Sequence, residues 1–381
     1  GAAFSMSDYN GGPIDEAYLS KRLRNEPLVE ITQAKGTSET HPFLSKNDEW
    51  AAFEAVTNHP GEKILTNLSG SYVRDAYLQG LTLQDQGKPN PFNFGVIGSS
   101  DTHVGGGSYT EETHFSKIGL LDGEPYLRGS VPFDGIYSLI ARLWQPDSIL
   151  EIDEKNYLSF SPRLIRFGSS GLAGVWAEEN TRESIYNAFR RKETFGTSGP
   201  RIKVRFFAGY NFENSNLNDQ DLIQEAYSKN IPMGGDIIQE KGKNPRFLVW
   251  AISDPLGAPL QRVQIIKGWL ADGEQREKVF DVACSDGQGV NPLNHRCPDN
   301  GAKVNLDDCS ISREKGNAEI KTFWQDPEFS NDQEAFYYAR VLENPTCRWS
   351  TWDAVRAEEK PRSDIPVTIQ ERAWSSPIWI K

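Results

Sequence analysis

The pattern of apolar residues changes near residue 200, and this change constrains the fold more than any other feature of the sequence. Before it, short apolar runs such as 28–32 and 92–97 alternate with amphipathic segments such as 71–81. Strands that alternate with helices are typical of a domain built on a parallel sheet. We therefore predict an α/β domain over residues 1–200.

Beyond Arg201 the sequence alternates between apolar and polar residues in short stretches. Turn signals such as Asp254-Pro255 and Asn344-Pro345 separate these stretches, and helical patterns are few. Short strands divided by turns indicate a β-sandwich. We expect residues 201–381 to form a β-sandwich-like domain.

The net charge and the hydropathy of the chain argue against two properties, binding to nucleic acid and crossing a membrane. The chain has 41 Lys and Arg against 53 Asp and Glu, a formal net charge of −12. No segment concentrates basic residues, so nucleic acid would be repelled overall. A membrane span needs about 18 or more consecutive apolar residues, and the sequence has no such run. We expect neither a nucleic-acid partner nor a membrane span.

The cysteines lie in and around a loop rich in Gly, Asn, Asp and Pro. They are Cys284, Cys297, Cys309 and Cys347. One or two disulfides would staple this loop, whereas a zinc knot that includes His295, or free thiols, are the alternatives. The spacing has no Cys-x-x-Cys pair, which favours disulfides over zinc. Disulfides together with only 2 Met predict a periplasmic or secreted protein.

The strongest motif follows the predicted strand 92–97. Gly98-Ser99-Ser100-Asp101-Thr102-His103 places a carboxylate and an imidazole one residue apart. Both side chains can point into a site at the strand end, where they could bind a divalent metal and take part in catalysis. In the alternative interpretation, Asp101 caps a turn and His103 is a surface residue. The position after a strand favours the functional interpretation.

Glu30 lies in the middle of the apolar run 28–32. A carboxylate there is costly to bury unless it is paired or binds a metal. If the strand is an edge, or if Glu30 pairs with Lys35, its role is structural. Combined with Asp101 and His103, it gives a ligand set that suits Mn, Fe or Zn.

Two polar segments are predicted to face the same site. In the loop 35–42, Lys35 could hold an anionic substrate, and Glu39 or His41 could transfer protons. After the next predicted strand, Glu178 and Arg182 could contact the substrate, Arg182 from a helix N-terminus. The alternatives are a polar loop in the first case, and a helix cap at Asn180 with solvated charges in the second.

Several common enzyme classes lack their motifs. The sequence contains neither the Gly-x-x-x-x-Gly-Lys-Ser/Thr loop of nucleotide-binding enzymes nor the Gly-x-Ser-x-Gly of serine hydrolases. Gly105-Gly106-Gly107 does not follow a strand, as a dinucleotide-binding fingerprint should. Among the enzyme classes considered, hydrolysis at a metal site is the one that these missing motifs do not exclude.

Four stretches carry a resemblance to a known superfamily. They are Pro27 to Glu39, Gly98 to His103, Gly174 to Arg182 and Glu371 to Trp379. In these stretches the sequence resembles the PHP (polymerase and histidinol phosphatase) superfamily of metal-dependent hydrolases, and most closely its large bacterial branch of unknown function. The resemblance covers most of the chain.

The resemblance implies a distorted, TIM-like barrel of parallel strands that holds two or three divalent metal ions. It implies that Glu30 bridges metals and that Asp101 and His103 bind them. The early His-x-His motif of the superfamily is missing, because none of the 5 His precedes His41. The chain therefore resembles the C-terminal part of such a protein, and an upstream segment is expected to complete the metal site. The alternative is that the metal site is incomplete.

The implied activity is hydrolysis of a small ester by a metal-activated water. A phosphoester is favoured, and a carbamate or carboxyl ester is the alternative. A non-catalytic binding protein with a degenerate barrel is the competing class, supported by the absent histidines and by a supply of tryptophans that could be exposed. These are Trp269, Trp324, Trp349, Trp352, Trp374 and Trp379.

Overall fold

The two apolar runs predicted as strands before residue 100 pair with each other in a small sheet. In the computed structural model, β1 (Leu28–Gln33) and β3 (Gly95–Gly98) run parallel, and β2 (Gly36–Thr37) folds back along β1. Helix α2 (Val73–Asp85) lies in the connection between β1 and β3 and buries its apolar face. Parallel strands need such a crossover. For this unit the predicted strand, helix and strand are confirmed.

Besides this unit, the structure contains further helices and two small pairs of strands, in addition to two larger sheets. The structure describes residues 3–8, 10–55, 68–133, 135–144, 149–158, 164–212, 215–331 and 333–381. The other helices are α1 (Glu16–Asn25), α3 (Ile136–Trp144), a 3-10 turn (Leu164–Arg166), α4 (Arg182–Arg190), α5 (Leu222–Lys229) and α6 (Trp349–Arg356). The two small antiparallel pairs are β4 (Ile149–Ile152) with β5 (Lys155–Leu158), and β16 (Thr346–Cys347) with β17 (Thr368–Ile369).

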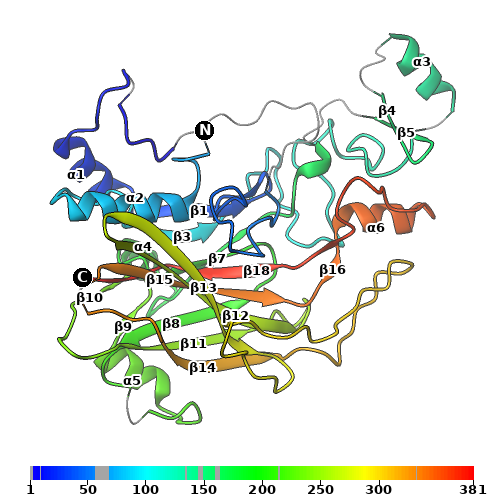
Figure 1. Cartoon of the computed structure of the whole chain (residues 1–381). Coiled ribbons are helices and arrows are strands. Elements are labelled where there is room, and N and C mark those ends of the chain that lie inside the picture. The colour runs from blue at the N-terminus through cyan, green and yellow to red at the C-terminus, as the bar shows by residue number, and fades with distance from the viewer. Residues whose placement is uncertain are drawn as a thin grey trace.

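A large sheet forms the centre of the molecule (Figure 1). Its strands are β6 (Leu172–Val175), β7 (Thr194–Thr197), β18 (Arg372–Ser375), β15 (Ala335–Glu343), β19 (Ile378–Ile380), β10 (Asp236–Ile237), β12 (Leu260–Ala271) and β13 (Glu274–Cys284). β15 is its central strand, because β12 pairs along one edge while β18 and β19 share the other. Strands from both sides of residue 200 therefore belong to one sheet.

A second sheet covers one face of the large sheet. It consists of β14 (Glu319–Gln325), β11 (Arg246–Ile252), β8 (Lys203–Gly209) and β9 (Ile231–Pro232). Alternate residues of the two sheets, such as Phe206 and Val249 against Ile265 and Val341, bury one apolar core between them. Helix α5 packs on the outer face of this second sheet. The strands within residues 203–380, together with β6 and β7, thus form two facing sheets, as in a sandwich.

The small sheet and α2 cover the opposite face of the large sheet (Figure 1). Contact is closest where β3 meets β6 and β7. A side chain on Gly98 would place its Cβ 2.6 Å from the backbone oxygens of Leu172 and Thr197. Gly196 has the same role on β7, since its Cβ would lie 2.6 Å from the Gly98 nitrogen. Glycine at both positions lets the backbones touch, which fixes the segment after β3.

The predicted α/β barrel is wrong. Among the described residues no sheet closes into a barrel, and parallel pairing is confined to β1 with β3 and β10 with β19. β6 pairs antiparallel with β7 even though α4 lies between them in sequence. A strand, a helix and a strand in succession do not by themselves dictate a parallel crossover, and here the helix returns the chain in the antiparallel direction.

The sequence also predicts a helix that begins at Ser45, because Ser45 and Asp48 have the spacing of a capping box and apolar residues up to Val56 recur at helical spacing. This prediction is wrong. The described part of that segment, up to residue 55, consists of turns. Ser45 shares a hydrogen bond of 2.6 Å with the Thr40 hydroxyl, and the Asp48 carboxylate accepts from buried guanidinium groups. Val56, assigned to the same helix, lies outside the described residues. The side chains interpreted as a capping box make tertiary contacts instead.

All four cysteines form disulfides, so the predicted staple is confirmed and the zinc and free-thiol alternatives are wrong. Cys284 pairs with Cys297 and Cys309 with Cys347. The second bond joins the long loop after β13 to β16. Two disulfides are compatible with a periplasmic or extracellular location. In the described residues we find no helix with the length and apolar character needed to cross a membrane.

Most of the tryptophans expected at the surface belong to the core. Trp349, Trp374 and Trp379 are buried, and Trp269 and Trp324 pack partly buried against the sandwich core. Trp352 is different, because its ring lines a cavity. The aromatic residues that supported a binding protein therefore mostly explain the packing of the sheets.

Candidate functional site

Polar side chains gather where β1 and β3 end. Parallel strands place their carboxyl ends at one edge. Gln33 at the end of β1 and Lys35 just after it therefore lie beside Asp101 and His103, which follow β3. The loop that follows brings Lys117 to the same place. We call these five residues the strand-edge site.

Asp101 is the centre of the strand-edge site. Its backbone φ is +50°, a conformation that few residues other than glycine adopt. Its Oδ2 accepts a hydrogen bond from Lys117 Nζ at 2.6 Å. With the Gln33 amide turned so that its nitrogen faces Asp101, Nε2 donates to Oδ2 at 2.9 Å and the amide oxygen accepts from Lys35 Nζ at 2.7 Å. A strained backbone thus holds a carboxylate between donors.

His103 lies at the open side of Asp101. Its Nε2 is 3.7 Å from Asp101 Oδ1, and 60% of its side chain is exposed. A backbone hydrogen bond of 2.8 Å from His103 N to Lys117 O ties the two loop segments together. The imidazole is therefore near the carboxylate and accessible to water.

The pKa of Lys35 depends on its burial and on the charged side chains around it. Partial burial lowers its pKa, and the Lys117 ammonium acts in the same direction, while the carboxylates of Glu30 and Asp101 act against them. The pKa of Lys35 is lowered as the net result. Glu30 itself is half-buried on β1, next to Ile97 of β3. The edge therefore contains two ammonium groups, two carboxylates and one imidazole.

The fit of these residues to the implied metal ions is incomplete. Asp101 and His103 offer the oxygen and nitrogen donors that Mn, Fe or Zn prefer. However, within the described ranges no group of three or more His, Cys, Asp or Glu side chains could hold a metal. The Lys117 ammonium also occupies Asp101 Oδ2. The described residues therefore do not make a metal site by themselves.

Glu39 does not lie at the strand edge. It is buried in the core, where Oε1 accepts hydrogen bonds from Arg74 NH2 at 2.6 Å, Tyr338 OH at 2.8 Å and Arg340 NH1 at 3.0 Å. Asp48 bonds to the same two guanidinium groups at 2.8 Å each. Burial raises the pKa of Glu39, but the charges of Arg340 and Arg74 outweigh burial and lower it. We call Glu39, Asp48, Arg74 and Arg340 the core ion network.

His41 is buried as well. Its Nδ1 accepts a hydrogen bond from Phe43 N at 3.2 Å, and its ring packs against Phe43 and Tyr72. Burial lowers the pKa of His41, which favours the neutral imidazole. The structure thus separates His41, like Glu39, from Asp101.

Glu178 and Arg182 lie at the opposite edge. β6 begins where β3 ends, since Gly171 N donates to Ser99 O at 2.9 Å, so its carboxyl end points away from the strand-edge site. Glu178 is exposed and pairs with Arg191 at 3.0 Å. Thr181, not Asn180, caps α4, and Arg182 is exposed in its first turn.

The sequence analysis did not identify four residues that the structure makes candidates for function. Lys117 comes from a loop without periodicity, so nothing local marks it. Glu111, Glu343 and Glu371 are buried and line a cavity of about 710 Å³. Glu371 begins one of the stretches that carry the resemblance, whereas Glu343 looks like the last residue of an ordinary strand.

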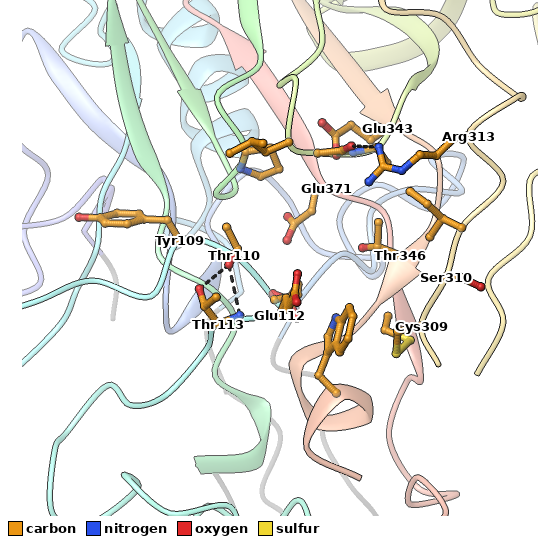
Figure 2. A pocket seen from close by; sticks show the side chains of 18 residues that line it. Tyr109, Thr110, Glu112, Thr113, Cys309, Ser310, Arg313, Glu343, Thr346 and Glu371 are labelled. Atoms are coloured by element: carbon orange, nitrogen blue, oxygen red, sulfur yellow. Dashed lines mark hydrogen bonds between the residues drawn. A yellow bond between two sulfur atoms is a disulfide. The ribbon is translucent and has the colours of Figure 1, made fainter. Parts of the chain in front are cut away.

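The cavity carboxyls have unusual ionisation. Burial raises the pKa of Glu343 to about 8, and the nearby charge of Asp254 adds to the effect. Burial, together with the charges of Glu111 and Glu343, raises the pKa of Glu371 well above its ordinary value. Ser198 Oγ donates a hydrogen bond to Glu371. Figure 2 shows the Glu371 side chain directed into this cavity.

Comparison with protein families identifies a match over the whole chain. The family described as a protein of unknown function, DUF3604, matches residues 1–381. A search of the curated proteins gives no match to the chain.

We predict that Glu39→Gln destabilises the protein. The change leaves the buried guanidinium groups of Arg74 and Arg340 with Asp48 as their one shared carboxylate, and Arg74 keeps only a longer pair with Glu277 at 3.4 Å. Breaking a buried ion pair typically costs about 3–5 kcal/mol. Urea denaturation measures the loss. Glu178→Gln is the control, because its pair with Arg191 is exposed to solvent and contributes little to stability. An unchanged free energy of unfolding for Glu39→Gln would show that the core ion network is not structural.

We predict that Glu343 makes stability fall as pH rises. Its pKa is about 8 when folded, against an ordinary value of 4.5. Between these values the folded state binds more protons, so this group lowers the free energy of unfolding by about 1.4 kcal/mol per pH unit. Glu343→Gln should therefore flatten the dependence of the unfolding temperature on pH between about 5 and 8. Glu112→Gln, an exposed neighbour, should not, and equal slopes in the two variants would refute the assignment.

Proposed function

The chain belongs to the DUF3604 family of proteins of unknown function, and for this member we propose hydrolysis of a small ester, with a phosphoester favoured, at the strand-edge site. The observation that carries the proposal is the meeting of Lys35, Lys117, Asp101 and His103 at the ends of two parallel strands. Two ammonium groups suit an anionic substrate. A carboxylate beside an exposed imidazole suits proton transfer.

The lysines would bind and stabilise the ester. Lys117 Nζ is fixed by Asp101 at 2.6 Å, and Lys35 Nζ lies within hydrogen-bond distance of Gln33. Ammonium groups held in advance stabilise charge that develops on phosphoryl or carboxyl oxygens during attack. The same pair favours a phosphoester over a neutral carbamate or carboxyl ester, which is the second substrate class.

His103 would act as the general base. With Nε2–H facing Asp101, the free Nδ1 accepts a proton from water. The water oxygen then forms a bond to phosphorus or to the carbonyl carbon, and the bond to the leaving oxygen breaks. The proton passes from His103 to that leaving oxygen, which restores the neutral imidazole. Asp101 orients the ring and stabilises its charged form.

Binding of divalent metal ions at this site is still a prediction from the sequence. They would polarise the ester and acidify a bound water. Because the described residues offer two adjacent ligands and not three, no step above depends on a metal. Elemental analysis of the natively purified protein tests this prediction directly.

We predict that the purified protein hydrolyses p-nitrophenyl phosphate faster than p-nitrophenyl acetate. His103→Gln should lower kcat/KM by about a hundredfold or more, as loss of a general base does. Lys117→Met should raise KM for the phosphate ester more than for the acetate. Lys229→Met, an exposed lysine on α5, is the control and should match the wild type.

Two results would contradict the proposal. Full activity in both the His103 and the Lys117 variants would place the reaction elsewhere. Absence of hydrolysis of either ester, with metal added or removed, would favour a non-catalytic binding protein.

A further inference from the structure

The cavity of about 710 Å³ is separate from the strand-edge site and shares none of its residues. Its walls come from the segment 109–113, the turn 256–258, the loop 309–313, the ends of β15 and β16, and α6. Segments far apart in sequence thus converge at this cavity, and the Cys309–Cys347 disulfide fastens one wall. A cavity of this size fits a small organic molecule.

Carboxyl groups outnumber basic groups in the cavity wall. Four glutamates, Glu111, Glu112, Glu343 and Glu371, line the cavity. Arg313 is the basic residue among the lining residues, and its NH1 donates to the backbone oxygen of Gly257 at 3.3 Å. The lining therefore holds more carboxyl groups than cations to neutralise them.

Glu343 has an oxygen without a partner. The residue is 1% exposed, and no hydrogen-bond donor in the described part of the chain reaches its Oε1. Its Oε2 accepts from Ala258 N at 3.3 Å, which is a long bond. A buried carboxyl oxygen without a donor is costly, so a donor from a ligand would be favourable.

Glu371 stands next to Glu343. The backbone of Glu343 donates to Glu371 O at 2.9 Å, so the two residues lie on adjacent strand ends. The Glu371 carboxyl points into the open part of the cavity (Figure 2). Burial raises the pKa of both carboxyls. The charge of Asp254 adds to this effect at Glu343, and the charges of Glu111 and Glu343 add to it at Glu371.

Much of the rest of the cavity wall is apolar, although the hydroxyl residues Thr110, Thr113, Ser310 and Thr346 also line it. Leu256, Ile311, the Trp352 ring and the Cys309–Cys347 disulfide line it. Apolar walls exclude water and strengthen any ion pair formed inside. An occupant that fits both parts has a charged donor at one end and an apolar body at the other.

We propose that this cavity binds a small organic cation, an ammonium compound with an apolar body, whose charged group lies between Glu343 and Glu371. The ammonium donates to the unpartnered Oε1 of Glu343 and to the carboxyl of Glu371, and its positive charge favours the ionised form of both carboxyls. The apolar body packs against Trp352 and Ile311. The inference does not depend on the proposed hydrolase activity.

Calorimetric titration at neutral pH with three matched probes tests the proposal. Phenethylammonium is the cation, 2-phenylethanol its neutral analogue and phenylacetate the anion. We expect saturable binding of the cation alone. The double variant Glu343→Gln/Glu371→Gln should weaken it by about tenfold or more, since each tenfold step is about 1.4 kcal/mol. Glu183→Gln, an exposed residue of α4, should bind as the wild type does.

Circular dichroism shows whether the double variant is folded. If the double variant does not fold, each single glutamine variant is titrated in its place, and each should weaken binding. Equal binding of the neutral probe, preferred binding of the anion, cation affinity unchanged by the glutamine variants, or no binding of the cation at millimolar concentration would each overturn the proposal.

Discussion

The core ion network holds the two halves of the sequence together. Glu39 and Asp48 come from the segment after β1, Arg74 from α2 and Arg340 from the central strand of the large sheet, 301 residues beyond Glu39. Buried charges are tolerated only when each is paired and hydrogen-bonded. In this network the Tyr338 hydroxyl completes the partners of Glu39. The network therefore fixes the small sheet on the large one, and with it the edge where β1 and β3 end.

This arrangement separates charges that build the fold from charges that are available for chemistry. Glu39 and His41 are enclosed, whereas Asp101 and His103 stand at an edge that water can reach. The contact of Gly98 with β6 and β7 adds a second constraint, because it sets the direction in which the chain leaves β3. The left-handed conformation of Asp101 follows directly after this contact. A rigid support under an exposed acid–base pair is what a catalytic site requires.

The sequence predicted local elements well and their pairing poorly. The strands at 28–32 and 92–97 and the helix between them follow from apolar periodicity, which local residues determine. The antiparallel direction of β6 relative to β7 depends on tertiary contacts, which local sequence does not show. The prediction of a parallel barrel is wrong for this reason. Asp101 and His103 could be found because they follow a strand directly. Lys117 could not, since only the folded loop brings it to Asp101 Oδ2. Glu343 looks like any strand residue until the cavity around it is seen.

The central claim is that Lys35 and Lys117 make the strand edge an anion site. Calorimetric titration with inorganic phosphate tests it most directly, because it needs neither a known substrate nor turnover. The account predicts saturable binding by the wild type, weakened about tenfold or more by Lys117→Met and unaffected by Glu343→Gln. Phosphate affinity that is the same in the wild type and the Lys117 variant would contradict it.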